Sequence, residues 1–268
     1  NRQRQWFSLE DAGRMQGLLG AESGKGIDFK PYVSNKWASG DSSDGNEFDT
    51  GFDLFYRVTP SLTATLTYNT DFAETEVDQR KVNLSRFPLF YPEKRDFFLE
   101  GAEQFTFGGL SESPLAFHSR TIGLSPEGKK IDVVGGAKIT GRQGRIGIGM
   151  LGMGLDERGD INADEVFAGR FTYDLMEESK IGAIFTHGDP QANIENNLVG
   201  VDLNLRASEW WHGQSVVFHS FYMKTHDGET GSDDVMGAWF SLPNYPFRMG
   251  GHWEGTGPIL LHSLRLRF

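Results

Sequence analysis

Strict alternation of apolar and polar residues runs through most of this chain. In residues 62–69, the side chains of Leu62, Ala64, Leu66 and Tyr68 would share one face of an extended strand. Residues 167–175 and 199–206 repeat the pattern, with charges or amides at the polar positions. A period of two residues indicates β-strands with one apolar and one polar face. The chain is therefore predicted to be all-β, and alternation alone leaves both a soluble sandwich and a membrane barrel open.

The composition supports strands and excludes several other classes of protein. The 268 residues include 34 glycines, 38% hydrophobic and 13% aromatic residues, a mixture typical of strands joined by many tight turns. No apolar run approaches the ~18 residues that a transmembrane helix needs. A net charge of -11 argues against nucleic acid as a partner. The absence of cysteine fits an exported protein; because residues 1–4 do not resemble a signal peptide, we expect its processed or truncated form.

Turn signals divide the chain into roughly 12–14 segments of about 8–12 residues, near the length with which a tilted strand crosses a bilayer. Sheets of this size rarely stay open, because closure into a barrel removes the unpaired edges. Residues 264–268 (Leu-Arg-Leu-Arg-Phe) alternate again and end on an aromatic residue, which resembles the C-terminal signature of bacterial outer-membrane barrels. We therefore predict a single antiparallel transmembrane β-barrel domain over residues 1–268, in the outer-membrane lipid of a Gram-negative-type bacterium.

One segment, residues 73–109, breaks the alternation. It contains Pro88 and Pro92 within a dense run of charges and aromatic residues, so it cannot be a lipid-facing strand. We expect this long connection to fold into or against the lumen as a plug or constriction. Its charged side chains form the predicted site, which comprises Glu74, Glu76, Asp78, Arg80, Lys81, Arg86, Glu93, Lys94, Arg95, Asp96 and Glu100.

These charges have two interpretations. Because Glu74, Glu76 and Asp78 are two residues apart, an extended chain would point all three to one side. The functional interpretation is a charged constriction or solute site, since rings of charge set the selectivity of pores. The structural interpretation is an ion-pair network that holds the segment in place. The structural one is favoured because buried charges need partners before they need substrates.

The same segment carries a family resemblance. Residues 69–78 (Asn-Thr-Asp-Phe-Ala-Glu-Thr-Glu-Val-Asp), 82–87 (Val-Asn-Leu-Ser-Arg-Phe) and 92–101 (Pro-Glu-Lys-Arg-Asp-Phe-Phe-Leu-Glu-Gly) resemble a family of bacterial outer-membrane barrels of unknown function. With its flanks, the resemblance covers residues 17–152. The family's barrel typically follows a periplasmic carbohydrate-binding domain of the family-nine type, which implies an association with saccharides. Here only a remnant in residues 1–16 would correspond to that domain, and the chain is short after Trp253.

Shorter patterns point to no cofactor, metal or catalytic residue. Gly147, Gly149 and Gly152 match a dinucleotide-binding spacing, but they lie in an alternating run followed by a turn instead of a helix. Close packing against a plug or neighbouring strand explains these glycines better. The acidic residues within 156–165 lack EF-hand spacing, so a solvated loop is expected in preference to a calcium site. The seven histidines show no metal-ligand spacing.

Aromatic residues at strand ends form a second predicted set, which comprises Trp210, Trp211, Trp239 and Phe268. Membrane barrels place such side chains in belts at the lipid–water interface. A sugar-stacking platform is the alternative, and the belt is favoured.

Three functions remain open at this point. The first is a channel or transport role for small polar solutes, with saccharides implied by the family resemblance. The second is a structural barrel with a plugged lumen that docks a protein partner in the outer membrane. The third is a membrane-embedded hydrolase, for which His219 could act with a serine or aspartate, although no sequence feature selects a pair.

Overall fold

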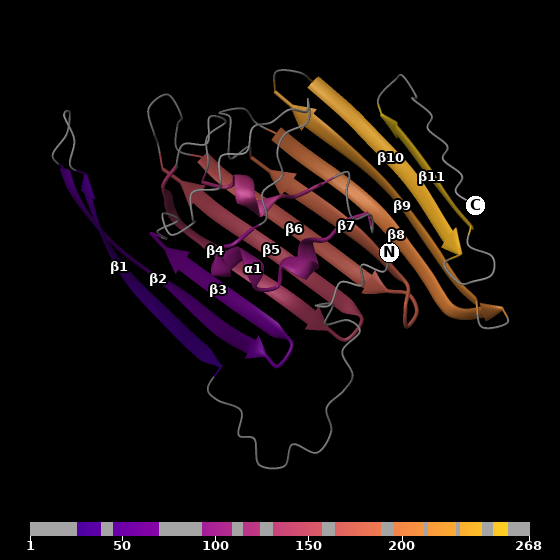
Figure 1. The fold of residues 1–268 in the computed structure, drawn as a ribbon, viewed down its shortest axis with the longest axis horizontal. Helices are drawn as coiled ribbons and strands as arrows, with labels where there is room; N and C mark the ends of the chain where they lie inside the picture. Colours follow the sequence, from indigo (N-terminus) through magenta and orange to yellow (C-terminus); the bar gives the residue numbers. More distant parts are fainter. Residues whose placement is uncertain are drawn as a thin grey trace, which may run out of the picture.

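Eleven strands form one antiparallel sheet in the order of the chain, from β1 to β11 (Figure 1). The computed structural model describes residues 26–38, 45–69, 93–108, 115–123, 131–156, 164–188, 196–211, 214–228, 231–242 and 249–256. Every strand pairs with its neighbour in the sequence, which is the topology of an up-and-down meander. The strands are β1 (Ile27–Ala38), β2 (Gly45–Thr59), β3 (Leu62–Tyr68), β4 (Val133–Gln143), β5 (Ile146–Leu155), β6 (Asp164–Asp174), β7 (Lys180–His187), β8 (Asn196–Trp211), β9 (Gln214–Asp227), β10 (Gly231–Leu242) and β11 (Met249–Thr256).

In the part of the chain that the structure describes, helical structure is confined to three short pieces between β3 and β4. These are α1 (Asp96–Leu99) and the 3₁₀ turns η3 (Ala102–Phe105) and η4 (Ser119–Thr121). Among the described residues, no helix is long and apolar enough to cross a membrane. The all-β prediction is confirmed.

Short turns set the register of the sheet. The connection between β4 and β5 has two residues, and Gly144 adopts a φ of 60°, as the tight turns of hairpins require. Between β2 and β3, the Ser61 amide donates to the Thr59 hydroxyl at 3.3 Å, and the pairing shifts by one residue between Arg57 and Thr59. These turns fix which side chains point to each face, because a slip of one residue would invert the whole strand.

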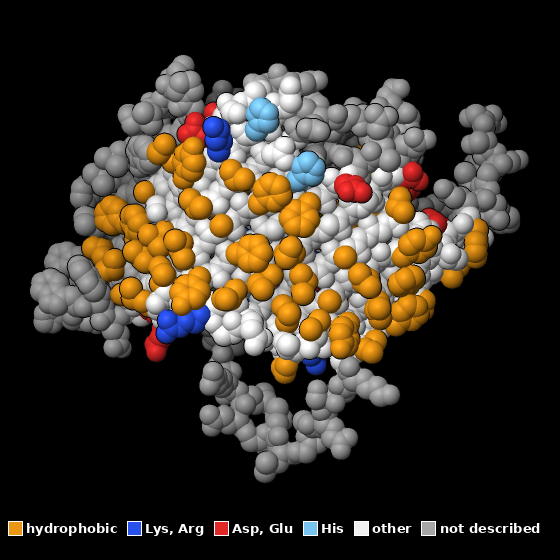
Figure 2. Space-filling model, turned by 180° about the vertical axis from the view of Figure 1, so that it is seen from behind, with side chains coloured by type: hydrophobic (Ala, Val, Ile, Leu, Met, Phe, Trp, Pro, Cys, Tyr) orange, Lys and Arg blue, Asp and Glu red, His pale blue; other side chains and the backbone are white. Residues whose placement is uncertain are grey.

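The sheet has two faces of opposite character. One, which we call the inner face, carries buried polar side chains such as Thr65, Lys138 and Arg170. The other, which we call the outer face, carries exposed apolar side chains such as Leu66 and Phe171. Figure 2 views the outer face, where hydrophobic side chains extend over the strands and charged side chains lie near its margins. The period of two seen in the sequence therefore separates two surfaces over nearly the whole sheet.

Residues 93–108 and 115–123, which we call the inner segment, lie on the inner face (Figure 1). Two apolar clusters join this segment to the sheet. In the first, Phe97, Phe98 and Ile122 pack against residues of β4, β5 and β6; in the second, Phe107 and Ala116 pack against residues of β7, β8 and β9. The sheet side chains involved are Val133, Leu151, Met153, Leu155, Val166 and Ala168 in the first cluster, and Ile184, Leu198, Phe221 and Met223 in the second.

The described sheet is open, so the expectation of a closed barrel with roughly 12–14 strands is not confirmed. Its eleven strands include β1 and β11 as edges, and no pairing joins these two among the described residues. The described strands are fewer than the roughly 12–14 expected, and several exceed the expected length: β2 has 15 residues, β8 has 16 and β9 has 14. The sequence signature in residues 264–268 lies outside the described residues.

Candidate functional site

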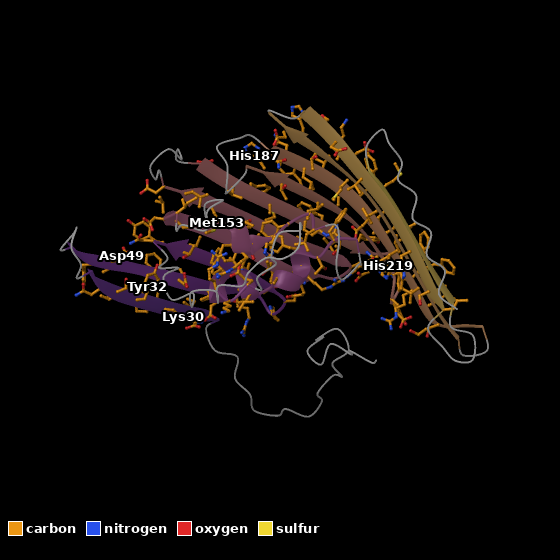
Figure 3. All side chains as sticks on the ribbon, turned by 45° about the horizontal axis from the view of Figure 1, so that its top comes forward. Lys30, Tyr32, Asp49, Met153, His187 and His219 are labelled. Atoms are coloured by element: carbon orange, nitrogen blue, oxygen red, sulfur yellow. The ribbon has the colours of Figure 1, made fainter. Side chains whose placement is uncertain are left out.

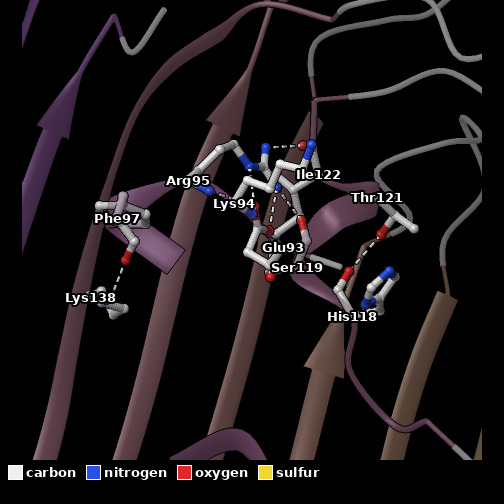
Figure 4. A network of polar contacts seen from close by, with 9 residues as sticks. All are labelled: Glu93, Lys94, Arg95, Phe97, His118, Ser119, Thr121, Ile122 and Lys138. Atoms are coloured by element: carbon white, nitrogen blue, oxygen red, sulfur yellow. Dashed lines mark hydrogen bonds and ion pairs between the residues drawn. The ribbon is translucent and has the colours of Figure 1, made fainter. Parts of the chain in front are cut away.

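The first element of the site is a clip between the two parts of the inner segment (Figure 4). The Glu93 carboxylate accepts from Arg95 Nε and Nη2, both at 2.8 Å, and from the Ser119 hydroxyl at 2.7 Å. Arg95 also donates to the carbonyls of Ile122 at 2.7 Å and Ser119 at 2.6 Å. Because these bonds join residues 93–95 to residues 119–122, the ion pair fastens two stretches of chain that lie far apart in sequence.

Electrostatics favour the charged form of this clip. Burial by itself would raise the pKa of the Glu93 carboxyl, but the hydrogen bonds and charge of Arg95, with the bond from Ser119, lower the pKa to about 2. The Arg95 guanidinium also lies 4.1 Å from the centroid of the Phe98 ring, a cation–π contact. Burial lowers the pKa of neighbouring His118, so its ring favours the neutral form. The clip is thus a charged pair with its hydrogen bonds supplied from nearby chain.

A second anchor holds α1 against β4. The Lys138 ammonium on the inner face donates to the carbonyls of Phe97 and Glu100, and it lies 4.9 Å from the centroid of the Phe97 ring. Gly101 follows α1 with a φ of 71°, and a Cβ there would lie 2.6 Å from Thr140 Cβ. Only glycine accommodates both the left-handed backbone and so close an approach to the sheet.

A third anchor is a buried ion pair beneath the end of the inner segment. Arg170 Nη1 on β6 lies 2.7 Å from Asp202 Oδ1 on β8, and both side chains are 1% exposed. Arg170 Nε donates to the Thr106 carbonyl at 3.0 Å, while the Gly108 amide donates to Asp202 Oδ2 at 3.1 Å. The pair therefore binds the backbone of the inner segment with both of its charges, which offsets part of the cost of burying them.

The polar network continues from Asp202 toward β10. Asn204 Nδ2 donates to Asp202 Oδ2 at 2.9 Å, and the side-chain oxygen Asn204 Oδ1 contacts His219 Nδ1. The His219 ring stacks on Trp239 with centroids 5.3 Å apart. Since His219 and Trp239 are register partners on the face that carries Asp202, Trp239 belongs to the inner face.

The side of the inner face formed by β1, β2 and β3 is held differently. Lys30 on β1 forms an ion pair with Asp96 of α1, with 3.2 Å between Nζ and Oδ2, and these side chains are 48% and 70% exposed. Figure 3 shows Lys30, Tyr32 and Asp49 together on these strands, away from His219 on β9. Side-chain hydrogen bonds also link these strands to one another; for example, Asn69 Nδ2 donates to Asp49 Oδ1 at 2.6 Å.

The structure separates the predicted charges. Glu93 and Arg95 join in the clip, Lys94 is exposed, Asp96 reaches β1, and the Glu100 side chain is exposed beside β1 and β2. The remaining predicted charges, which are Glu74, Glu76, Asp78, Arg80, Lys81 and Arg86, lie outside the described residues, as does Phe268. Trp210 and Trp211 lie at the end of β8, and their side chains are outside the described part.

Sequence reasoning missed Lys138, Arg170 and Asp202, although all three occupy inward positions of alternating strands. Alternation marked Arg170 and Asp202 as polar-face residues, but only the register and packing show that the three side chains meet the inner segment. Gly149 on β5 packs closely as proposed, because a Cβ there would lie 3.2 Å from the Gln104 Cβ and from the Phe105 ring, whereas a Cβ on Gly152 would make an ordinary contact with Phe167 at 3.9 Å. Within the described part of the chain, no group of three or more His, Asp or Glu side chains could hold a metal ion.

Comparison with known proteins gives one result. A domain of unknown function, DUF5916, is found at residues 26–151, which run from β1 through the inner segment to β5. The match is consistent with an uncharacterised family, and its description states no activity. Neither the curated proteins nor the solved structures include a match to this chain.

Proposed function

We propose that this chain forms the wall of an outer-membrane β-barrel that passes small polar solutes. The observation that carries the proposal is the inverted distribution of side chains between the two faces. Large apolar side chains on the outer face are exposed from β1 to β9, while Arg170, Asp202 and Lys138 are buried on the inner face. The exposed set includes Phe29, Val33, Tyr56, Leu66, Phe171, Tyr173, Ile181, Phe185, Val199, Val201 and Tyr222.

Hydrocarbon is the environment that best suits such an outer face. Exposed apolar side chains spread over the outer face from β1 to β9, whereas soluble monomers rarely expose contiguous apolar patches larger than a few hundred Å². Membrane barrels have this arrangement, with apolar residues toward lipid and polar residues toward the interior. The meander order of the strands also matches that of up-and-down barrels. Saccharides are the solute class that the family resemblance implies.

The test is insertion and conductance of the purified chain in a planar bilayer. We expect stable steps that scale with salt concentration, because a polar interior carries ions. The variant Val201→Arg should insert poorly, since an arginine on the lipid face near the membrane centre costs about 2–4 kcal/mol. Thr63→Arg, on the inner face, is the matched control and should insert normally. Equal insertion of both variants would contradict the assignment of the faces.

A docking barrel with a plugged interior is the second candidate. It is favoured by the firm attachment of the inner segment, which two apolar clusters and a buried ion pair hold against the sheet. A barrel that inserts but stays silent, and that copurifies with an outer-membrane protein, would support this candidate over a channel. The hydrolase gains no support, because the contacts of His219 described above are with Asn204 and Trp239, neither of which is a nucleophile.

A further inference from the structure

We infer that the solute path runs along β1, β2 and β3, between these strands and the end of α1, and that it admits small zwitterionic or neutral polar solutes. The inference rests on the proposed function, which it deepens by naming the path. It begins from the unequal attachment of the inner segment. Apolar clusters join that segment to β4 through β9, whereas the exposed Lys30–Asp96 pair joins it to β1.

An open pocket lies on this weakly attached side. Its volume is about 330 Å³, and the described residues around it include Asp28, Lys30, Arg57, Thr63 and Glu100. Four of these are charged side chains that are exposed, whereas the charged side chains beneath the inner segment, such as Lys138 and Arg170, are buried. A group of water-accessible charges on the inner face therefore lies beside β1 and β2, next to the end of α1.

The signs of the charges indicate the class of solute. Among the described residues that line the pocket, Asp28 and Glu100 contribute two carboxylates, and Lys30 and Arg57 contribute two cations, so these four charges are balanced. Asp96, the partner of Lys30, is not among the lining residues. A lining of one sign would select ions of the opposite charge. A balanced lining instead offers donors and acceptors to polyhydroxylated or zwitterionic molecules. We therefore expect weak selectivity between small cations and anions.

The absence of cysteine from the chain makes a direct test possible, because a single introduced thiol is the only one present. Thr63→Cys places that thiol at the pocket. Thr65→Cys is the matched control: Thr65 lies two residues further along β3 on the same face, but it is fully buried. Its hydroxyl has no hydrogen-bond partner in the structure, so the substitution removes no bond.

The measurement is single-channel conductance during addition of a charged, membrane-impermeant methanethiosulfonate reagent. We expect a stepwise loss of conductance for Thr63→Cys and no change for Thr65→Cys. Conductance that persists in both variants, despite labelling at residue 63, would overturn the path while leaving the channel in place. Equal loss in both would show that the inner segment does not shield β3 and would also overturn it. A protein that inserts into the bilayer without conducting would contradict both the proposed channel function and the proposed solute path.

Charge variants give an independent readout. Arg57→Gln should shift the reversal potential toward cation preference, and Glu100→Gln should shift it toward anion preference, because each removes one sign from the lining. Glu178→Gln is the control, since this glutamate lies in the turn between β6 and β7 and bonds to Ser208. Reversal potentials that stay at the parent value for both pocket variants would contradict the inference.

Discussion

The inner segment meets the two sides of the sheet in different ways. Against β4 through β9 it buries aromatic rings and pairs its backbone with buried charges, whereas the contact described between α1 and β1 is an ion pair exposed to solvent. Apolar burial stabilises in proportion to the area removed from water, while an exposed ion pair contributes about 0–1 kcal/mol. The inner segment is therefore fixed mainly to β4 through β9, and its described attachment to β1 is weak.

The largest expected effect follows from removing an aromatic ring of the first cluster. Phe97 is 1% exposed and packs with Phe98 edge to face, with centroids 5.0 Å apart. Phe97→Ala should lower the free energy of unfolding by about 3–5 kcal/mol, because it leaves a cavity under α1. Urea titration in detergent micelles measures the change, and Phe97→Leu should cost less. A loss equal to that of an exposed residue would mean that the cluster does not hold the segment.

The second largest effect is expected on acidification, which should protonate Glu93 and weaken the clip. The pKa of Glu93 falls from 4.5 to about 2 in the folded protein, so its stabilisation is complete above pH 4.5 and is lost as the pH falls toward 2. Protonation of Glu93 should lower the free energy of unfolding by at most about 3 kcal/mol. Burial lowers the pKa of His118 from 6.5, so protonation of the unfolded chain adds a loss that begins below that pH.

Hydrogen exchange of the amides in residues 93–123, corrected for intrinsic rates, follows this loss across the pH range. Glu93→Gln should lower protection at neutral pH and remove the part of the pH dependence below 4.5. Unchanged protection of the parent protein down to pH 2.5 would contradict the role of Glu93 as a charged clip.

The sequence predicted the strands and the two faces well, because alternation is local. Leu62–Tyr68 is a strand with the predicted faces, and the register keeps the same alternation across the sheet. The prediction of charge partners was poorer: Arg170 and Asp202 lie on strands that are not neighbours, so only the pairing register brings them together. Trp239 was predicted to belong to an interfacial aromatic belt because it lies near a strand end. The face to which its side chain points is determined by its register with His219.

A smaller effect on stability is expected at Gly200, which lies against Phe107 of the second cluster. A Cβ on Gly200 would lie 2.8 Å from Phe107 Cζ, so Gly200→Ala should cost about 1–3 kcal/mol through overpacking. Gly152→Ala is the matched control, because its Cβ would lie 3.9 Å from Phe167, an ordinary contact. Thermal unfolding of the two variants in the same detergent compares them. Similar unfolding temperatures for the two variants would indicate that the Phe107 ring does not pack closely against β8.

The smallest effect should come from the weakly attached side. Asp96→Asn removes the Lys30 ion pair, which both side chains make in contact with solvent, and should change stability by less than about 1 kcal/mol. The difference should shrink further at high salt, because exposed charges are screened. Urea titration at low and high ionic strength measures it. A cost comparable to that of Phe97→Ala would remove the contrast between the two sides.

The orientation of the sheet toward lipid is tested most directly by spin-label accessibility in phospholipid vesicles. Single cysteines at Leu66, Phe171 and Val201 on the outer face, and at Thr63 on the inner face, would each carry a nitroxide. The barrel proposal predicts that the three outer labels collide with oxygen dissolved in the bilayer and are shielded from a polar nickel chelate, and that the label at residue 63 meets the chelate. Outer labels as accessible to the chelate as the inner one would contradict it.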